Sequence, residues 1–128
     1  MTVQTTAALR DALKVYSEIE RHLVGLGKAG DPARRLELVQ WRRKLAEQTG
    51  AVGTLIECDP VLAQNPQKQQ EMHRIFSAFR YAFGHHQASW PVVASSTDVP
   101  EYVASAKEAY GKADIFWAWC ATNLDMAA

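Results

Sequence analysis

Two adjacent histidines stand close to a serine in this sequence, and an imidazole beside a hydroxyl is the pairing that activates a serine nucleophile. His86 and Ser89 are three residues apart and His85 and Ser89 are four apart, so on a helix either imidazole could reach the hydroxyl. A serine nucleophile also requires a group that orients the base and an oxyanion hole, and the neighbouring residues supply neither. The sequence therefore lacks a complete catalytic constellation and favours a protein that is not an enzyme.

The same segment has two other interpretations, and both stay open at this point. In the first, His86 continues an aromatic stripe formed by Phe76, Phe79, Phe83 and Trp90, and its nitrogens are satisfied inside a helical bundle. In the second, the segment contributes to a small-ligand pocket at one end of the bundle, since aromatic walls with one or two polar groups are typical of such pockets. The residues that would line this pocket are Phe83, His86, Trp90, Tyr110 and Trp117.

Metal ligands are the next residue types that could perform chemistry. Helical bundles that bind a metal pair usually carry Glu-x-x-His on two helices. Glu71 and His73 are only two residues apart and point to different sides of a helix. His22 follows Glu18 by four residues, but no second segment supplies a matching pair. We therefore expect no metal site and no cofactor.

The two cysteines and the hydropathy pattern bear on location. Cys58 and Cys120 are far apart, and we expect two unreactive free thiols. The first ten residues lack a basic segment followed by an apolar one, so no secretory signal is expected. No apolar run approaches the roughly 18 residues of a membrane span. These features predict a cytoplasmic protein with no membrane partner.

Positive charge gathers around the first half of the second expected helix. The residues are Arg34, Arg35, Arg42, Arg43 and Lys44. Glu37 and Glu47 lie within one helical turn and would partly neutralise them, which is typical of a solvated face. An acidic protein partner for Arg42 and Arg43 is the alternative. Nucleic acid is disfavoured, because the chain has 14 basic and 14 acidic residues and no exposed aromatic residues are expected among the basic ones.

Residues 115–120, Ile-Phe-Trp-Ala-Trp-Cys, would form a helix that is apolar around most of its circumference. Trp117 and Cys120 occupy the inward positions of this helix. Ile115 and Trp119 are four residues apart on another face, and we expect them to form a patch buried against another protein or a second copy. The alternative is that the bundle is splayed here, so that one of the first two helices covers both faces.

Three breaks divide the chain into four expected helices of similar length. These lie near residues 5–27, 32–57, 66–90 and 99–125. Each break pairs a capping residue with a proline near the start of the next helix. The pairs are Asp31-Pro32, Asn65-Pro66 and Asp98-Pro100. Gly50 and Gly53 leave open whether the second helix is continuous, because each glycine costs about 1 kcal/mol relative to alanine in a helix.

The length of 128 residues, with 48% hydrophobic and 22% charged residues, fits a single domain over residues 1–128. Four helices with short connections predict an all-α fold, an antiparallel up-down-up-down four-helix bundle. A three-helix bundle with a broken second helix is the alternative. The leading expectation for function is a non-enzymatic interaction protein, such as an adaptor, regulator or chaperone-like subunit, acting with another protein or as a homodimer. A ligand-binding bundle is the alternative function.

Overall fold

The computed structural model describes residues 2–29, 35–90 and 100–126 and contains four long helices. They are α1 (Ala7–Ala29), α2 (Arg35–Cys58), α3 (Pro66–Ser89) and α4 (Pro100–Asn123), with a short 3-10 helix η2 (Leu62–Gln64) before α3. Within the described ranges, β pairing is limited to an isolated bridge between Val3 and Leu124. The prediction of an all-α fold with four helices is confirmed.

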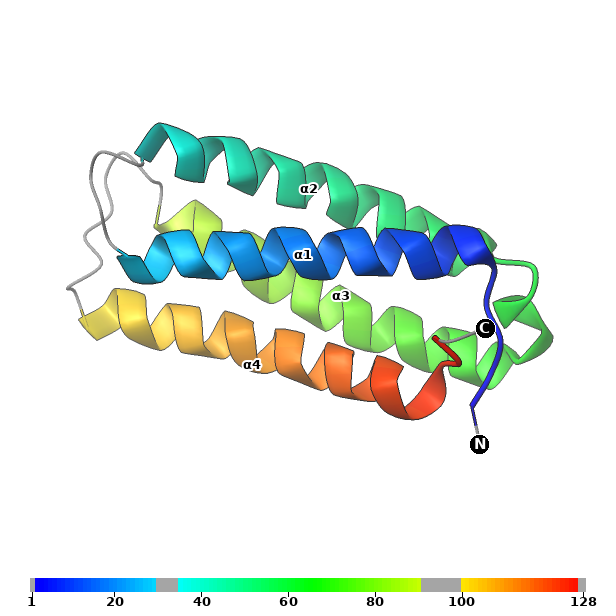
Figure 1. The fold of residues 1–128 in the computed structure, drawn as a ribbon. Helices are drawn as coiled ribbons and strands as arrows, with labels where there is room; N and C mark the ends of the chain where they lie inside the picture. The colour runs from blue at the N-terminus through cyan, green and yellow to red at the C-terminus, as the bar shows by residue number, and fades with distance from the viewer. Residues whose placement is uncertain (1, 30–34, 91–99, 127–128) are drawn as a thin grey trace.

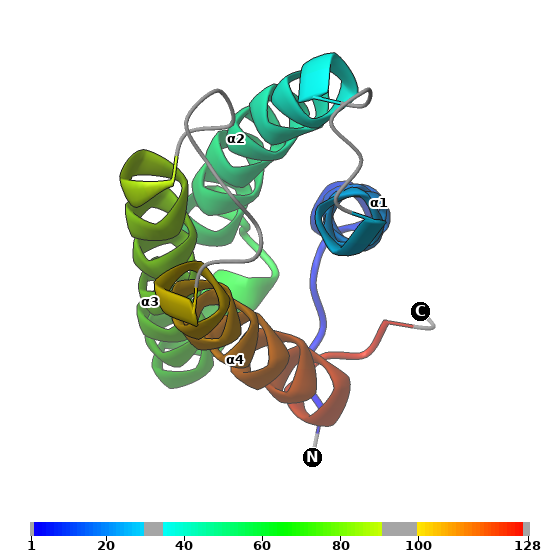
Figure 2. The same ribbon diagram turned by 90° about the vertical axis from the view of Figure 1, so that its left-hand side faces the viewer.

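Consecutive helices run in opposite directions along the long axis of the molecule (Figure 1). α1 packs mainly against α2, α3 packs mainly against α4, and α2 joins the two pairs through α3. Viewed along the bundle, the four helices surround a common core in the order α1, α2, α3, α4 (Figure 2). The described ends of the chain lie together at one end of the bundle, where the Val3 amide donates to the Asn123 carbonyl at 2.8 Å.

The core is built from one apolar stripe on each helix, as the three-four spacing of these residues requires. Its largest fully buried side chains are Tyr16, Phe76, Phe79 and Phe116. The Tyr16 ring lies 6.0 Å from Phe76 and 5.6 Å from Phe79, so α1 and α3 meet at the centre of the bundle. Three small residues of α4 are buried and leave room for these aromatic rings: Ala106, Ala109 and Ala113.

Polar side chains join α1 to α2 inside this packing. The Thr49 hydroxyl donates to the Leu45 carbonyl at 2.7 Å, so the Tyr16 hydroxyl, 2.8 Å from Thr49 Oγ1, is the donor in that pair. Burial is the main reason why the pKa of Tyr16 rises to about 12. The Gln48 amide donates to the Ala12 carbonyl at 2.9 Å, so a second polar side chain of α2 faces α1.

The second helix is continuous through both of its glycines. Gly53 is buried, and a Cβ at this position would lie 3.4 Å from Arg80 Nη1 and 3.5 Å from Phe76 Cε2. The small residue therefore marks a close approach of α2 to α3, not a break in the helix. This settles the question that the sequence left open at Gly50 and Gly53.

Candidate functional site

Four of the five residues predicted to line a pocket come together at the end of the bundle where α3 finishes and α4 begins. The Phe83 ring lies 5.8 Å from Tyr110, and the rings of His86 and Trp90 lie 5.1 Å and 5.6 Å from Tyr102. Tyr102 was not among the predicted residues. It lies one turn before Ala106 on the apolar stripe of α4, and that spacing is the signal that could have identified it.

Trp117, the fifth predicted residue, lies further along α4 and belongs to a different environment. Its ring is 6.0 Å from Tyr16, and its Nε1–H donates to Glu20 Oε2 at 2.7 Å. Burial raises the pKa of Glu20 above its usual value, and the hydrogen bond from Trp117 only partly opposes that shift. Trp117 therefore joins α4 to α1 and stands apart from the cluster around Tyr102.

His86 is buried, with 4% of its surface exposed, and its partner is Ser105 on α4. The distance from His86 Nδ1 to Ser105 Oγ is 2.7 Å, whereas Ser89, the serine considered from the sequence, is exposed. Burial lowers the pKa of His86, and the charges of Arg42 and His85 lower it further. The imidazole is therefore neutral at neutral pH and satisfies one nitrogen within the bundle, as the first of the two interpretations required.

Arg42 turns inward at this end of the bundle, and this corrects its expected place on a solvated basic face. Its Nη1–H donates to the Trp90 carbonyl at 2.9 Å, which caps the C-terminus of α3. Burial lowers the pKa of Arg42, while the phenols of Tyr102 and Tyr110 oppose that shift. Arg43 is exposed, because consecutive residues of a helix point about 100° apart. The two expected basic contact residues therefore differ, because Arg42 is half-buried against the end of α3 and Arg43 is exposed.

The expected apolar patch is divided in the same way. Trp119 is only 7% exposed, and its Nε1–H donates to Glu71 Oε1 on α3 at 2.7 Å, so its predicted place on the outside is wrong. Ile115 is 54% exposed. Four residues advance a helix by about 40° beyond a full turn, and this rotation brings the long indole under α3. The covering helix is α3, whereas the sequence pointed to the first or second helix.

The side of α4 that faces away from the core carries Ile115, the charged Glu108 and four small side chains. We call this surface the outer face of α4, and its residues are Ala104, Glu108, Gly111, Ile115, Ala118 and Thr122, all of them exposed. Their spacing alternates between four and three residues, so they form one straight stripe. A Cβ at Gly111 would meet no atom within 4 Å. Apart from Glu108, the outer face of α4 therefore consists of short side chains and one large apolar side chain, Ile115.

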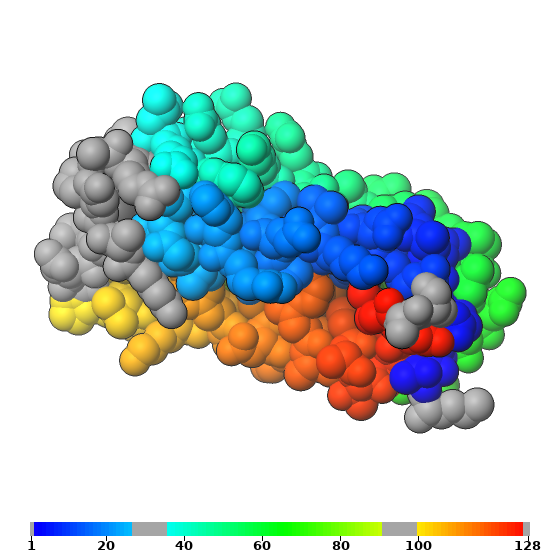
Figure 3. All heavy atoms as spheres, in the orientation of Figure 1, coloured from blue at the N-terminus to red at the C-terminus, as the bar shows by residue number. Residues whose placement is uncertain are grey.

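Two shallow grooves border α4. One, of about 310 Å³, lies between α1 and α4 and is lined by Leu13, Trp117, Cys120 and Met126 together with the charged Lys14 and Arg21. Figure 3 shows α1 and α4 lying side by side along this face. The other groove, of about 270 Å³, lies between α3 and α4, and its lining includes Tyr81, His85 and Ser105. The Tyr81 and His85 rings are stacked at 6.0 Å, and Tyr81 is 75% exposed.

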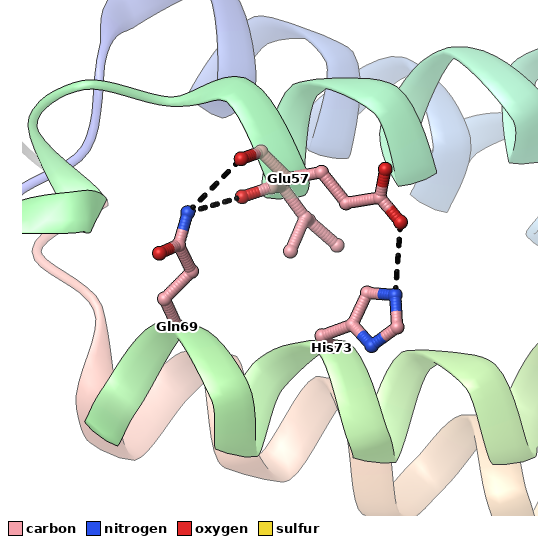
Figure 4. Close-up of polar contacts among 4 residues, drawn as sticks. Glu57, Gln69 and His73 are labelled. Carbon is pink, nitrogen blue, oxygen red and sulfur yellow. Dashed lines mark hydrogen bonds and ion pairs between the residues drawn. The ribbon is translucent and has the colours of Figure 1, made fainter. Parts of the chain in front are cut away.

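The end of α2 and the start of α3 are held together by polar contacts at the surface (Figure 4). His73 Nε2 lies 3.0 Å from Glu57 Oε1, and the Gln69 amide donates to the carbonyls of Ile56 and Glu57 at 3.0 Å and 3.2 Å. No third His, Cys, Asp or Glu joins this pair, and no such group of three that could hold a metal ion occurs elsewhere in the described ranges. These contacts have a structural role between helices.

The two cysteines differ sharply in environment, and this gives a testable prediction. Cys58 is exposed, whereas Cys120 is buried, and burial raises the pKa of the Cys120 thiol to about 12. Because the thiolate is the reactive species and Cys58 is accessible, we expect iodoacetamide to modify Cys58, contrary to the expectation of two unreactive thiols, and to leave Cys120 intact in the folded protein at pH 8. Mass spectrometry of digested protein, with a urea-unfolded sample as control, measures this. Equal labelling of both cysteines under native conditions would contradict the burial of Cys120.

No protein-family model, curated protein or solved structure matches this chain. None of the described helices is both long enough and apolar enough to cross a membrane. The two features of the described chain that bear on function are the bundle end around Tyr102 and the outer face of α4.

Proposed function

We propose that this chain is a non-enzymatic interaction protein, an adaptor, regulator or chaperone-like subunit, that binds its partner through the outer face of α4. The observation that carries the proposal is the 54% exposure of Ile115 in a stripe whose other residues, apart from Glu108, have small side chains. Small residues let the backbone of a partner helix approach closely, and an isoleucine among them supplies apolar area to bury. Trp119 lies one turn beyond Ile115 and joins α4 to α3 through its hydrogen bond with Glu71, which fixes the orientation of the outer face.

A second copy of the chain is the first partner to test, because a symmetric dimer is the commonest way to bury such a surface. Equal numbers of acidic and basic residues mean that two copies carry no net charge that would keep them apart. The exposed Arg43 extends the proposal to an acidic partner at the start of α2. Both cysteines are free thiols, which supports a reducing compartment, and we propose the cytoplasm.

Sedimentation equilibrium over a wide concentration range tests self-association. We expect the wild type to form a dimer at high concentration and Ile115→Glu to weaken it by about tenfold or more, since a buried charge without a partner is costly. Leu36→Glu is the matched control, because Leu36 is 70% exposed on α2 and lies away from α4. A monomeric wild type, or equal weakening by both substitutions, would contradict self-association through the outer face of α4.

The cluster at the end of the bundle favours a second candidate function, the binding of a small ligand. Its rings belong to Phe83, Trp90, Tyr102 and Tyr110, and its polar groups are those of Arg42, His86 and Ser105. Aromatic walls with a few converging polar groups are the usual composition of ligand sites.

A further inference from the structure

The guanidinium of Arg42 has no anionic partner in the described part of the chain. Arg42 is half-buried, and a cation that has lost part of its hydration is stabilised by a nearby anion. His22 pairs with Glu37 and His73 pairs with Glu57, and neither pair involves Arg42. Capping of α3 at the Trp90 carbonyl uses one N–H of the five that a guanidinium carries.

Neutral hydrogen-bonding groups surround this cation. The phenols of Tyr102 and Tyr110 lie close enough to Arg42 to raise its pKa against the effect of burial. The His86 imidazole, paired with Ser105 at 2.7 Å, lies 5.1 Å from the Tyr102 ring between ring centroids. One permanent positive charge, hydroxyl groups and a neutral imidazole therefore lie together. The Glu20 carboxylate acts on Tyr110, but no carboxylate among the described residues forms an ion pair with Arg42.

We propose that this cluster binds a small monocarboxylate with an apolar body, with Arg42 as its ion partner and the Tyr102 hydroxyl as a second donor. The planar fork of a guanidinium matches the two oxygens of a carboxylate. A single cation matches a single negative charge, and the neighbouring Arg43 and Lys44 are exposed, with Lys44 lying over the Trp41 ring at 4.2 Å. The ring of Trp90 offers an apolar wall to the body of the ligand.

This inference rests on the second candidate function, ligand binding at the end of the bundle, and specifies its ligand class. It does not depend on self-association through the outer face of α4. Three probes distinguish the contribution of the ligand's charge from that of its apolar body. Benzoate carries the proposed charge and an apolar ring, benzamide carries the ring without the charge, and inorganic phosphate carries charge without an apolar body.

The experiment is a titration of the full chain followed through its tryptophan indole N–H signals by NMR. We expect benzoate to shift the Trp90 signal saturably and to leave unchanged the Trp119 signal, which belongs to a bond with Glu71 and reports on folding. Removing a charged hydrogen-bonding partner by Arg42→Gln is expected to weaken benzoate binding by about tenfold or more. Arg43→Gln, the adjacent exposed arginine, is the matched control and should bind benzoate as the wild type does.

Tyr102→Phe removes one hydroxyl and keeps the ring. If Arg42→Gln unfolds the protein, as shown by loss of the Trp119 signal, Tyr102→Phe tests the binding site in its place. We expect it to weaken benzoate binding several-fold, by about the worth of one hydrogen bond. Benzamide binding as tightly as benzoate would overturn the carboxylate inference and leave ligand binding standing. Phosphate binding more tightly than benzoate would overturn it too, as would equal losses in Arg42→Gln and Arg43→Gln. A Trp90 signal unmoved by benzoate and benzamide would overturn both the inference and the second candidate function.

Discussion

Replacing Trp119 by alanine is expected to lower the free energy of unfolding by about 3–5 kcal/mol, the range for removing a large aromatic side chain from a core. Trp119 is 7% exposed and fills the space between α4 and α3. Its loss also leaves the Glu71 carboxylate, now 2.7 Å from the indole N–H, without that donor. Urea denaturation followed by circular dichroism measures the change.

Two further variants identify the cause of this loss. Trp119→Phe keeps most of the buried area and removes the hydrogen bond to Glu71, so it should cost about 1–3 kcal/mol. Ile115→Ala, four residues earlier on the same helix, should cost about 0.5 kcal/mol or less, as is usual for a surface position. If Trp119→Ala and Ile115→Ala had similarly small effects, Trp119 would lie at the surface, and its packing against α3 would be wrong.

The local signals in the sequence were sufficient for the helices themselves. Asn65 and Pro66 predict a helix start at 66, and α3 begins at Pro66 with Asn65 at its N-cap, although the Asn65 side chain makes no capping hydrogen bond. The ends of α1 and α4 differ from the predicted limits by about two residues, because helix termini fray and capping patterns do not fix the last turn. The expected caps at Asp31 and Asp98 lie outside the described residues.

The partners across helices could not be predicted, and this is why the candidate sites changed. The helical phase of Trp119 gives its angle around α4. It does not show how far the indole extends or that Glu71 on α3 accepts its hydrogen bond. Arg42 likewise resembles Arg43 in sequence, and only the end of α3 at Trp90 gives its guanidinium a carbonyl to cap. Whether a long side chain at the edge of an apolar stripe is buried or exposed depends on its neighbours in space.

Asp59 is the residue whose loss should matter most outside the apolar core. Its Oδ2 accepts from the amide and hydroxyl of Thr6 at 3.0 Å and 2.9 Å, and its Oδ1 accepts from the amides of Val61 and Leu62, both at 2.9 Å. The carboxylate therefore ties the start of α1 to the connection between α2 and α3. Asp59→Ala leaves these donors without their acceptor, and we expect a loss of about 2–4 kcal/mol in the free energy of unfolding at pH 7.

The pH dependence of the stability lost in Asp59→Ala distinguishes the contribution of the ionised carboxylate from that of side-chain packing. Burial alone would raise the pKa of Asp59, but the hydrogen bonds from Leu62, Thr6 and Val61 outweigh it and hold the pKa below its ordinary value of 3.8. As the pH falls below about 4, the unfolded chain takes up a proton before the folded protein does, so the stabilisation by Asp59 is present above its ordinary pKa and is lost in more acidic solution. Urea denaturation at pH 7 and pH 3 should show that the difference in free energy of unfolding between wild type and Asp59→Ala is smaller at pH 3.

Asp114→Ala, at an exposed carboxylate, is the control and should change the free energy of unfolding by no more than about 0.5 kcal/mol at pH 7. A gap for Asp59→Ala that stays constant with pH would mean that the ionised carboxylate is not what joins these segments.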